Sequence, residues 1–130
     1  MTSINDEQIM MALRDVVAEN PERVYKAPAV MSGSEGGTCF YVHVDDDGQE
    51  EPGCIVGTVL HRLGVPLAEL KKKEGLGALA AIRGLEPQVL ATHKTQAVLR
   101  DIQIRQDRGA PWGEAYTAAT GCAVPKPPKA

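Results

Sequence analysis

Aromatic residues are scarce in this chain of 130 residues, which contains one Phe, one Trp and three Tyr. Proteins that stack single-stranded bases need several aromatic side chains on one surface, so that class of protein is disfavoured. Positive charge is not in excess either, because 14 Lys and Arg stand against 17 Asp and Glu and give a net charge of −3. Binding that comes mainly from neutralising phosphates needs an excess of basic residues. We therefore do not expect nucleic acid as a partner.

Long apolar runs are also missing, and the first eight residues, MTSINDEQ, are mostly polar and include no basic side chain. A membrane-spanning helix needs about 20 largely apolar residues in succession. A secretory leader needs a basic start followed by an apolar stretch. We therefore expect no membrane segment, no leader and a cytoplasmic location.

The three cysteines, Cys39, Cys54 and Cys122, are an odd number without the spacing of a disulfide framework or a zinc ribbon, so free thiols are predicted. His43 and His61 are the other residues that a metal site would recruit. Cys39 and His43 lie four positions apart, roughly 13 Å along a predicted strand. Cys54 and His61 lie about 10 Å apart along a predicted helix, whereas zinc ligands converge within about 2 Å of one ion. We expect no metal and no cofactor.

The period of the apolar residues switches from 3.6 to 2 and back, which predicts an α+β fold that is mostly helical with a small antiparallel β-hairpin. Asn5 or Asp6 is expected to cap a first helix, which ends at Asn20 before Pro21. We expect the hairpin to pair Val24–Tyr25 with residues 39–44. A turn at residues 45–48, which read Asp-Asp-Asp-Gly, is expected to end the second strand.

The rest of the chain carries helical patterns. Helices are predicted at residues 55–63, 66–73 and 79–82, from Pro87 to about Arg108, and from Trp112 onward. Residues 1–121 are expected to form a single α+β domain. Residues 122–130 contain three prolines and are expected to be a disordered tail.

Cys54 is the one residue that suggests catalysis, because it stands at the start of a predicted helix, where the helix dipole lowers the pKa of a thiol. A thiol-dependent enzyme also needs a base and an oxyanion site. His61 lies two turns away, toward the other end of that helix. The simpler interpretation is a cysteine packed against the hairpin, with Gly57 allowing a strand to approach closely. The chain also lacks the common phosphate-binding and hydrolase motifs, so we expect no catalytic residues.

Two surface features suggest binding. Lys71, Lys72 and Lys73, together with Arg62, are a candidate basic spot, although lysines at the end of a helix usually only complement its dipole. The long predicted helix has a wider apolar face than one neighbour covers. Two rows on this face are distinguished. We assign the row of Ala91, Val98 and Ile102 to the core and the row of Leu90, Ala97 and Ile104 to the interface of a symmetric homodimer. In the alternative, the helix that carries Trp112 folds back over the apolar face and the domain stays monomeric.

Two sequence blocks carry a resemblance to a known family. They are Pro-Gly-Cys-Ile-Val-Gly at residues 52–57 and Gln-Asp-Arg-Gly-Ala-Pro-Trp-Gly-Glu-Ala at residues 106–115. With these blocks, residues 5–119 resemble small uncharacterised proteins of actinobacteriophages and their actinobacterial hosts. The family has no established activity and implies no catalytic residues. The resemblance implies a small phage protein that binds a host protein or itself, and some such proteins inhibit host growth.

The expected function is therefore non-enzymatic: a phage-type protein that binds a bacterial host protein and perturbs host function. A nucleic-acid-binding regulator that uses Lys71–Lys73 and a thiol-dependent enzyme that uses Cys54 are the alternatives.

Overall fold

The structure is a computed structural model, which describes residues 3–25, 41–44, 47–73, 78–85 and 87–124. The helices in these ranges are α1 (Asp6–Glu19), α2 (Ile55–Arg62), α3 (Leu67–Lys71), α4 (Ala78–Ala81), α5 (His93–Asp107) and α6 (Trp112–Thr120). The strands are β1 (Ile4–Asn5), β2 (Val42–Val44), β3 (Glu50–Pro52) and β4 (Val89–Leu90). Helices predominate and β2 pairs with β3 in an antiparallel hairpin, so the predicted α+β class is confirmed.

Helix α1 forms where the sequence predicts it. The Asn5 side chain accepts a hydrogen bond from the Gln8 backbone N–H, and the Gln8 side chain accepts one from the Asn5 N–H. This reciprocal cap satisfies two backbone donors that the first turn of a helix leaves unpaired. The helix ends at Glu19, and its apolar residues recur at helical spacing. Four of them are completely buried: Ile9, Leu13, Val16 and Val17.

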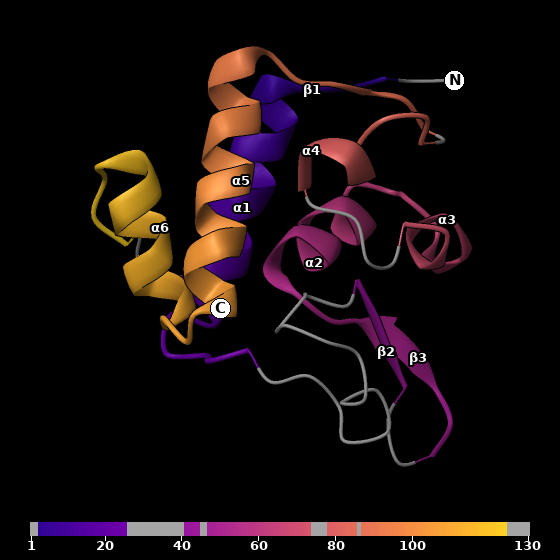
Figure 1. Cartoon of the computed structure of the whole chain (residues 1–130), viewed down its shortest axis with the longest axis horizontal. Helices are drawn as coiled ribbons and strands as arrows, with labels where there is room; N and C mark the ends of the chain where they lie inside the picture. The colour runs from indigo at the N-terminus through magenta and orange to yellow at the C-terminus, as the bar shows by residue number, and fades with distance from the viewer. Residues whose placement is uncertain (1–2, 26–40, 45–46, 74–77, 86, 125–130) are drawn as a thin grey trace.

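The core lies between α1 and the helices around it. Figure 1 shows α5 lying along α1, with α6 on one side and α2 and α4 on the other. The hairpin lies beyond the end of α2. No helix in the part of the chain that the structure describes is long and apolar enough to span a membrane. The largest completely buried side chains include Trp112, Tyr41, Leu60, Leu70 and Ile102.

The predicted second strand of the hairpin forms, but its pairing partner follows it in the sequence instead of preceding it. Residues 42–44 pair with Glu50–Pro52, and Val24–Tyr25 is not a strand. The Asp-Gly turn explains this difference, because Gly48 has a φ of +82° and that left-handed conformation suits a tight connection between adjacent strands. Local pairing across a short turn also costs less chain entropy than pairing with residues about 18 positions away. Residues 39 and 40 of the predicted second strand lie outside the described residues.

The long predicted helix begins later than expected. Val89 and Leu90 form β4, which pairs in parallel with Ile4 and Asn5, and α5 starts only at His93. Asp6 fixes this boundary, because its carboxylate accepts hydrogen bonds from both the backbone N–H and the hydroxyl of Thr92, at 2.9 and 2.6 Å. These hydrogen bonds also lower the pKa of Asp6. Leu90 is therefore not on the helix that carries Ala97 and Ile104.

Helix α6 is attached at its first turn to the segment that follows α1. The backbone N–H groups of Trp112 and Gly113 donate to the carbonyls of Arg23 and Pro21, at 2.9 and 2.8 Å. The Arg23 guanidinium lies 4.6 Å from the centre of the Trp112 ring, within cation–π range. The start of α6 therefore has partners for N–H groups that a helix cannot pair internally.

Gly57 lets α2 approach the residue before β2, as the sequence predicts. A Cβ atom at this position would lie 2.6 Å from the backbone oxygen of Tyr41, far inside van der Waals contact. The Tyr41 carbonyl also accepts a hydrogen bond from the Gly53 N–H at 2.9 Å. Tyr41 is itself completely buried, so its backbone has little room to shift.

We therefore expect Gly57→Ala to destabilise the protein by about 2 kcal/mol, because overpacking at a backbone contact outweighs the better helix propensity of alanine. Urea unfolding followed by circular dichroism measures this loss. Thr58→Ala is the control, since it removes only a hydroxyl bond to the Cys54 carbonyl within the same helix and should cost less than about 1 kcal/mol. Equal stabilities of Gly57→Ala and the wild type would contradict the close packing.

Candidate functional site

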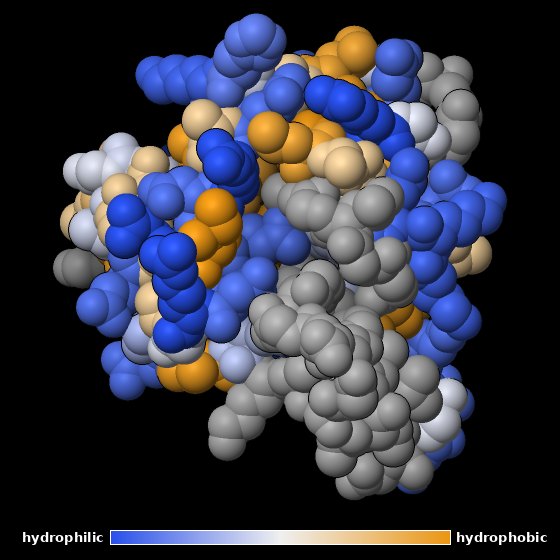
Figure 2. Space-filling model, viewed as in Figure 1, coloured by the Kyte–Doolittle hydropathy of each residue, from blue (hydrophilic) through white to orange (hydrophobic). Residues whose placement is uncertain are grey.

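An open groove of about 600 Å³ lies between α5 and α6, and one residue of α1 contributes to it. Its surface is mostly apolar, which is the usual character of sites that bind other molecules. Figure 2 shows a short strip of apolar side chains among hydrophilic ones over α5. We call this feature the α5–α6 groove, and it is lined by Met10, Lys94, Ala97, Val98, Asp101, Ala119, Thr120 and Cys122.

The predicted interface residues all lie at the surface. Leu90 is 51% exposed, Ile104 is 36% exposed and Ala97 is exposed within the α5–α6 groove. Leu90 belongs to β4, which precedes α5, so it is not part of the outer face of that helix. Whether these residues form an interface stays a prediction.

The inner row is divided between core and groove. Ile102 is completely buried, while Ala91 and Val98 are half-buried and pack against the core. Val98 also lines the groove. Ala91 precedes α5, so the predicted core row is correct only at Ile102. The buried residues of the helix are Thr95, Leu99, Ile102, Gln103 and Gln106.

Charged side chains lie at both ends of the part of α5 that lines the groove. Asp101 forms an ion pair with Arg105 one turn later, at 3.2 Å. Lys94 is exposed and forms no ion pair with any residue that the structure describes. The groove is therefore apolar at its centre, with one cation and one anion along the same helix.

Cys54 stands immediately before α2, at the helix start that the sequence predicts, but the expectation of a free thiol there is wrong. Cys54 is the N-cap of the helix, completely buried, and its sulfur is disulfide-bonded. A cystine sulfur has no thiolate, so it cannot act as the proposed nucleophile. His61 lies at the far end of α2, where its Nδ1 is 3.0 Å from the Val65 carbonyl. Cys122 is a free, exposed cysteine, and Cys39 lies outside the described residues.

The other metal-site candidate, His43, has a different partner. Its Nε2 lies 3.0 Å from the Tyr25 hydroxyl, and the two rings pack against each other. Burial, and secondarily the charge of Arg23, lowers the pKa of His43. Among the residues that the structure describes, no three His, Cys, Asp or Glu side chains lie close enough together to hold a metal ion.

The basic residues at the end of α3 are bound locally. Lys71 pairs with Glu50 and Lys72 with Glu69, while the Lys73 ammonium donates to the Arg83 carbonyl at 2.6 Å. Any phosphate would have to displace these partners.

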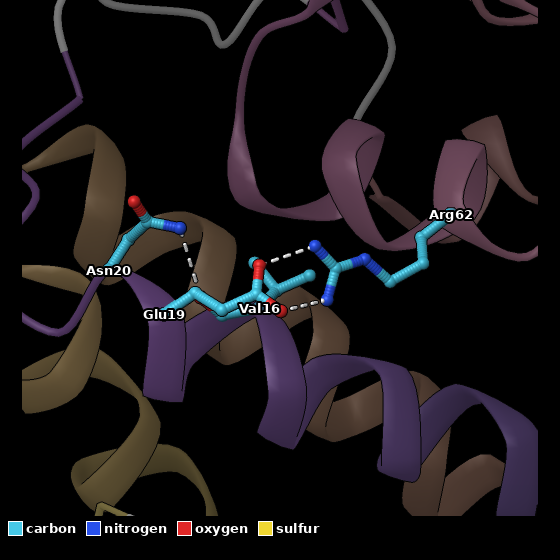
Figure 3. Close-up of polar contacts among 4 residues, drawn as sticks. All are labelled: Val16, Glu19, Asn20 and Arg62. Atoms are coloured by element: carbon cyan, nitrogen blue, oxygen red, sulfur yellow. Dashed lines mark hydrogen bonds and ion pairs between the residues drawn. The ribbon is translucent and has the colours of Figure 1, made fainter. Parts of the chain in front are cut away.

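Arg62 is bound in the same way. Figure 3 shows it reaching from α2 to Glu19 at the end of α1, where its two terminal nitrogens donate to both carboxylate oxygens. The predicted basic spot is therefore not an open cationic surface.

A polar cluster at the C-terminal end of α5 was not predicted. The side-chain oxygen of Gln106 accepts a hydrogen bond from the Ile55 N–H at 2.7 Å, and Gln103 donates to the Tyr41 hydroxyl at 3.2 Å. The Gln106 amide donates to Asp107 at 2.9 Å. Desolvation raises the pKa of Asp107 to about 6, although the bond from Gln106 acts in the opposite direction.

The signal for this cluster is the spacing of the two glutamines. Gln103 and Gln106 lie four and seven positions after Leu99, on the helix face that also carries Ile102. Both glutamines are buried. Polar residues on an apolar helical face indicate buried hydrogen-bond partners, because an unpaired amide in the core is costly.

Comparison with known families, curated proteins and solved structures found no match to this chain. The α5–α6 groove is the feature that supports a function best, because it is apolar and open, and its charged side chains remain accessible.

We expect fewer than three reactive thiols per chain in the denatured protein before reduction and three after reduction. The reason is that Cys122 is free while Cys54 is disulfide-bonded, and the chain has three cysteines. Titration with a chromogenic disulfide reagent in denaturant counts these thiols. Three thiols in oxidised, unreduced protein would return Cys54 to the list of candidate nucleophiles.

We expect Asp107→Asn to stabilise the protein at pH 7. The folded-state pKa of Asp107 lies above its ordinary value of 3.8, at about 6. Folding therefore favours the protonated form, and the native state loses stability as the pH rises from about 4 to about 6. Because the side chain is partly exposed, the gain from the neutral amide is about 1 kcal/mol at pH 7.

Urea unfolding of both proteins between pH 4 and pH 7 tests this expectation. The difference in unfolding free energy should be near zero at the acid end and widen as the pH rises. A variant that is less stable than the wild type by the same amount at every pH would show that the carboxylate is a favourable partner.

Proposed function

We propose that this protein acts non-enzymatically, by binding a bacterial host protein in the cytoplasm of the host cell and perturbing its function. The observation that carries the proposal is the α5–α6 groove, which exposes apolar surface on a helix whose opposite face is buried in the core. Exposed apolar surface bordered by polar side chains is typical of protein interaction sites.

The form of the groove favours a protein segment as its ligand. Two helices border it, and the small side chains of Ala97 and Ala119 leave space between them. An amphipathic helix that places apolar side chains into such a groove is a recurrent mode of protein recognition. The charges of Lys94 and Asp101 give the groove a polarity along α5, which a bound segment can match with its own charges.

Both alternatives have less support. The hypothesis of a nucleic-acid-binding regulator depends on Lys71–Lys73 and Arg62. Carboxylates already pair with Lys71, Lys72 and Arg62, and a carbonyl accepts a hydrogen bond from Lys73. The hypothesis of a thiol-dependent enzyme depends on Cys54, whose sulfur is disulfide-bonded. The proposal of a host protein as the partner rests on the resemblance of residues 5–119 to small actinobacteriophage proteins.

A disulfide at Cys54 is unusual for the proposed cytoplasmic location, because cytosolic thiol pools keep most cysteines reduced. Cys54 is 0% exposed and forms the N-cap of α2, which limits access of a reductant to this sulfur.

We also propose that the free protein is a homodimer that uses Ala97, Ile104 and Leu90. All three side chains are exposed, and Ala97 and Ile104 lie seven residues apart on the same side of α5. An apolar surface of this kind on a small domain is readily covered by a second copy.

We expect Ala97→Asp to abolish capture of the host partner, because it places a carboxylate in the apolar centre of the groove. The tagged protein is used to capture binding proteins from an actinobacterial lysate, and these are quantified by mass spectrometry. Met11→Asp is the matched control, since Met11 is 55% exposed on α1 and does not line the groove.

The proteins captured by the wild type should also be captured by Met11→Asp and be reduced at least about tenfold with Ala97→Asp. Circular dichroism checks that both variants are folded. Equal capture by Ala97→Asp would exclude the groove as the binding site. If the wild type captures no protein and its expression leaves host growth unchanged, the proposed function is wrong.

A further inference from the structure

The charges on the outer face of α5 form a symmetric pattern. Lys94 and Asp101 are seven residues apart, which is close to two helical turns and about 10.5 Å along the axis. They therefore lie on the same side of the helix, at equal distances from the midpoint between Ala97 and Val98. All four residues line the α5–α6 groove.

We infer that the α5–α6 groove of the free protein is occupied by α5 of a second copy, antiparallel to the first, with each Lys94 paired to Asp101 of the partner subunit. The inference rests on the proposed role of the groove as a protein-binding surface and names its occupant. A twofold axis between Ala97 and Val98 generates both ion pairs at once, because it exchanges positions 94 and 101.

The side chains at the centre permit this contact. Helices pack with their axes about 8–10 Å apart, and small residues at the crossing point allow the shorter distances. Ala97 supplies a small exposed side chain there. The same symmetry brings Ile104 of one copy toward the N-terminal end of α5 in the other, where Leu90 is exposed. The α5 and α6 helices of both copies then form a four-helix layer.

Charge complementarity favours a second copy of the chain as the occupant of the α5–α6 groove. In the antiparallel arrangement every Lys94 meets a carboxylate, whereas a parallel arrangement would place Lys94 against Lys94 of the partner subunit. Asp101 already has Arg105 beside it, but an exposed carboxylate accepts hydrogen bonds on several sides. Lys94 has no ion-pair partner among the described residues of its own chain, and the second copy supplies one.

A charge-reversal cycle tests the inference. Sedimentation equilibrium measures the dimer dissociation constant of the wild type, of Lys94→Glu, of Asp101→Lys and of the double variant. Each single change places like charges together twice and should weaken the dimer at least about tenfold. The double variant exchanges the two charges and should restore the dissociation constant to within about threefold of the wild-type value.

Arg100→Glu is the matched control, because Arg100 is an exposed basic residue of α5 that does not line the groove. It should leave the dissociation constant within about threefold of the wild-type value. The exposed thiol of Cys122 gives a second measurement. Alkylation of Cys122 should slow as the wild-type concentration rises through the dissociation constant, and should not depend on concentration in a monomeric variant.

Two results would overturn the inference: a wild-type protein that stays monomeric at the highest soluble concentration, or single and double variants that weaken the dimer equally. Neither result affects the host-protein proposal, because capture by the wild type and its loss with Ala97→Asp are measured separately. Conversely, a restored dimer in the double variant would establish the second copy even if no host protein is captured.

Discussion

The hydrogen bond between the Ile55 N–H and the Gln106 side chain joins the two halves of this structure. Ile55 opens α2 in the middle of the chain, and its N–H belongs to the first turn, where a helix has no internal partner for it. Both residues are almost completely buried, so water cannot replace the glutamine oxygen, which lies 2.7 Å away. An unpaired buried N–H would cost about 1–3 kcal/mol. Gln106 therefore has to face α2, and this requirement sets the rotation of α5 about its axis.

That rotation determines what the protein exposes. With Leu99, Ile102 and Gln106 turned toward the core, Ala97 and Ile104 lie on the outer side of α5. The start of α6 is tied to the carbonyls of Pro21 and Arg23, and its C-terminal residues border the outer side of α5. The α5–α6 groove is thus a consequence of how α5 and α6 are anchored at the opposite end of the helix pair. Asp107 is adjacent to Gln106, and its partial burial raises its pKa.

A single protein-binding surface connects the two proposals. If the second copy and the host protein use the α5–α6 groove, they exclude each other, and the protein that binds the host partner is the monomer. The apparent affinity for the partner then decreases as the protein concentration rises above the dimer dissociation constant, because fewer grooves are open. A dimer that buries the apolar groove until a partner is met would also limit nonspecific association.

The sequence by itself determined the features that depend on local chemistry. The cap of α1 at Asn5, the helix start after Cys54 and the close approach at Gly57 follow from short-range patterns. Tertiary structure decided the strand that pairs with β2, the start of α5 and the disulfide at Cys54. These depend on partners distant in sequence, as when Asp6 binds Thr92 across 86 positions. The groove depends on the same kind of contact, because hydrophobic periodicity specifies which face of a helix is apolar but not which neighbouring helix leaves part of that face uncovered.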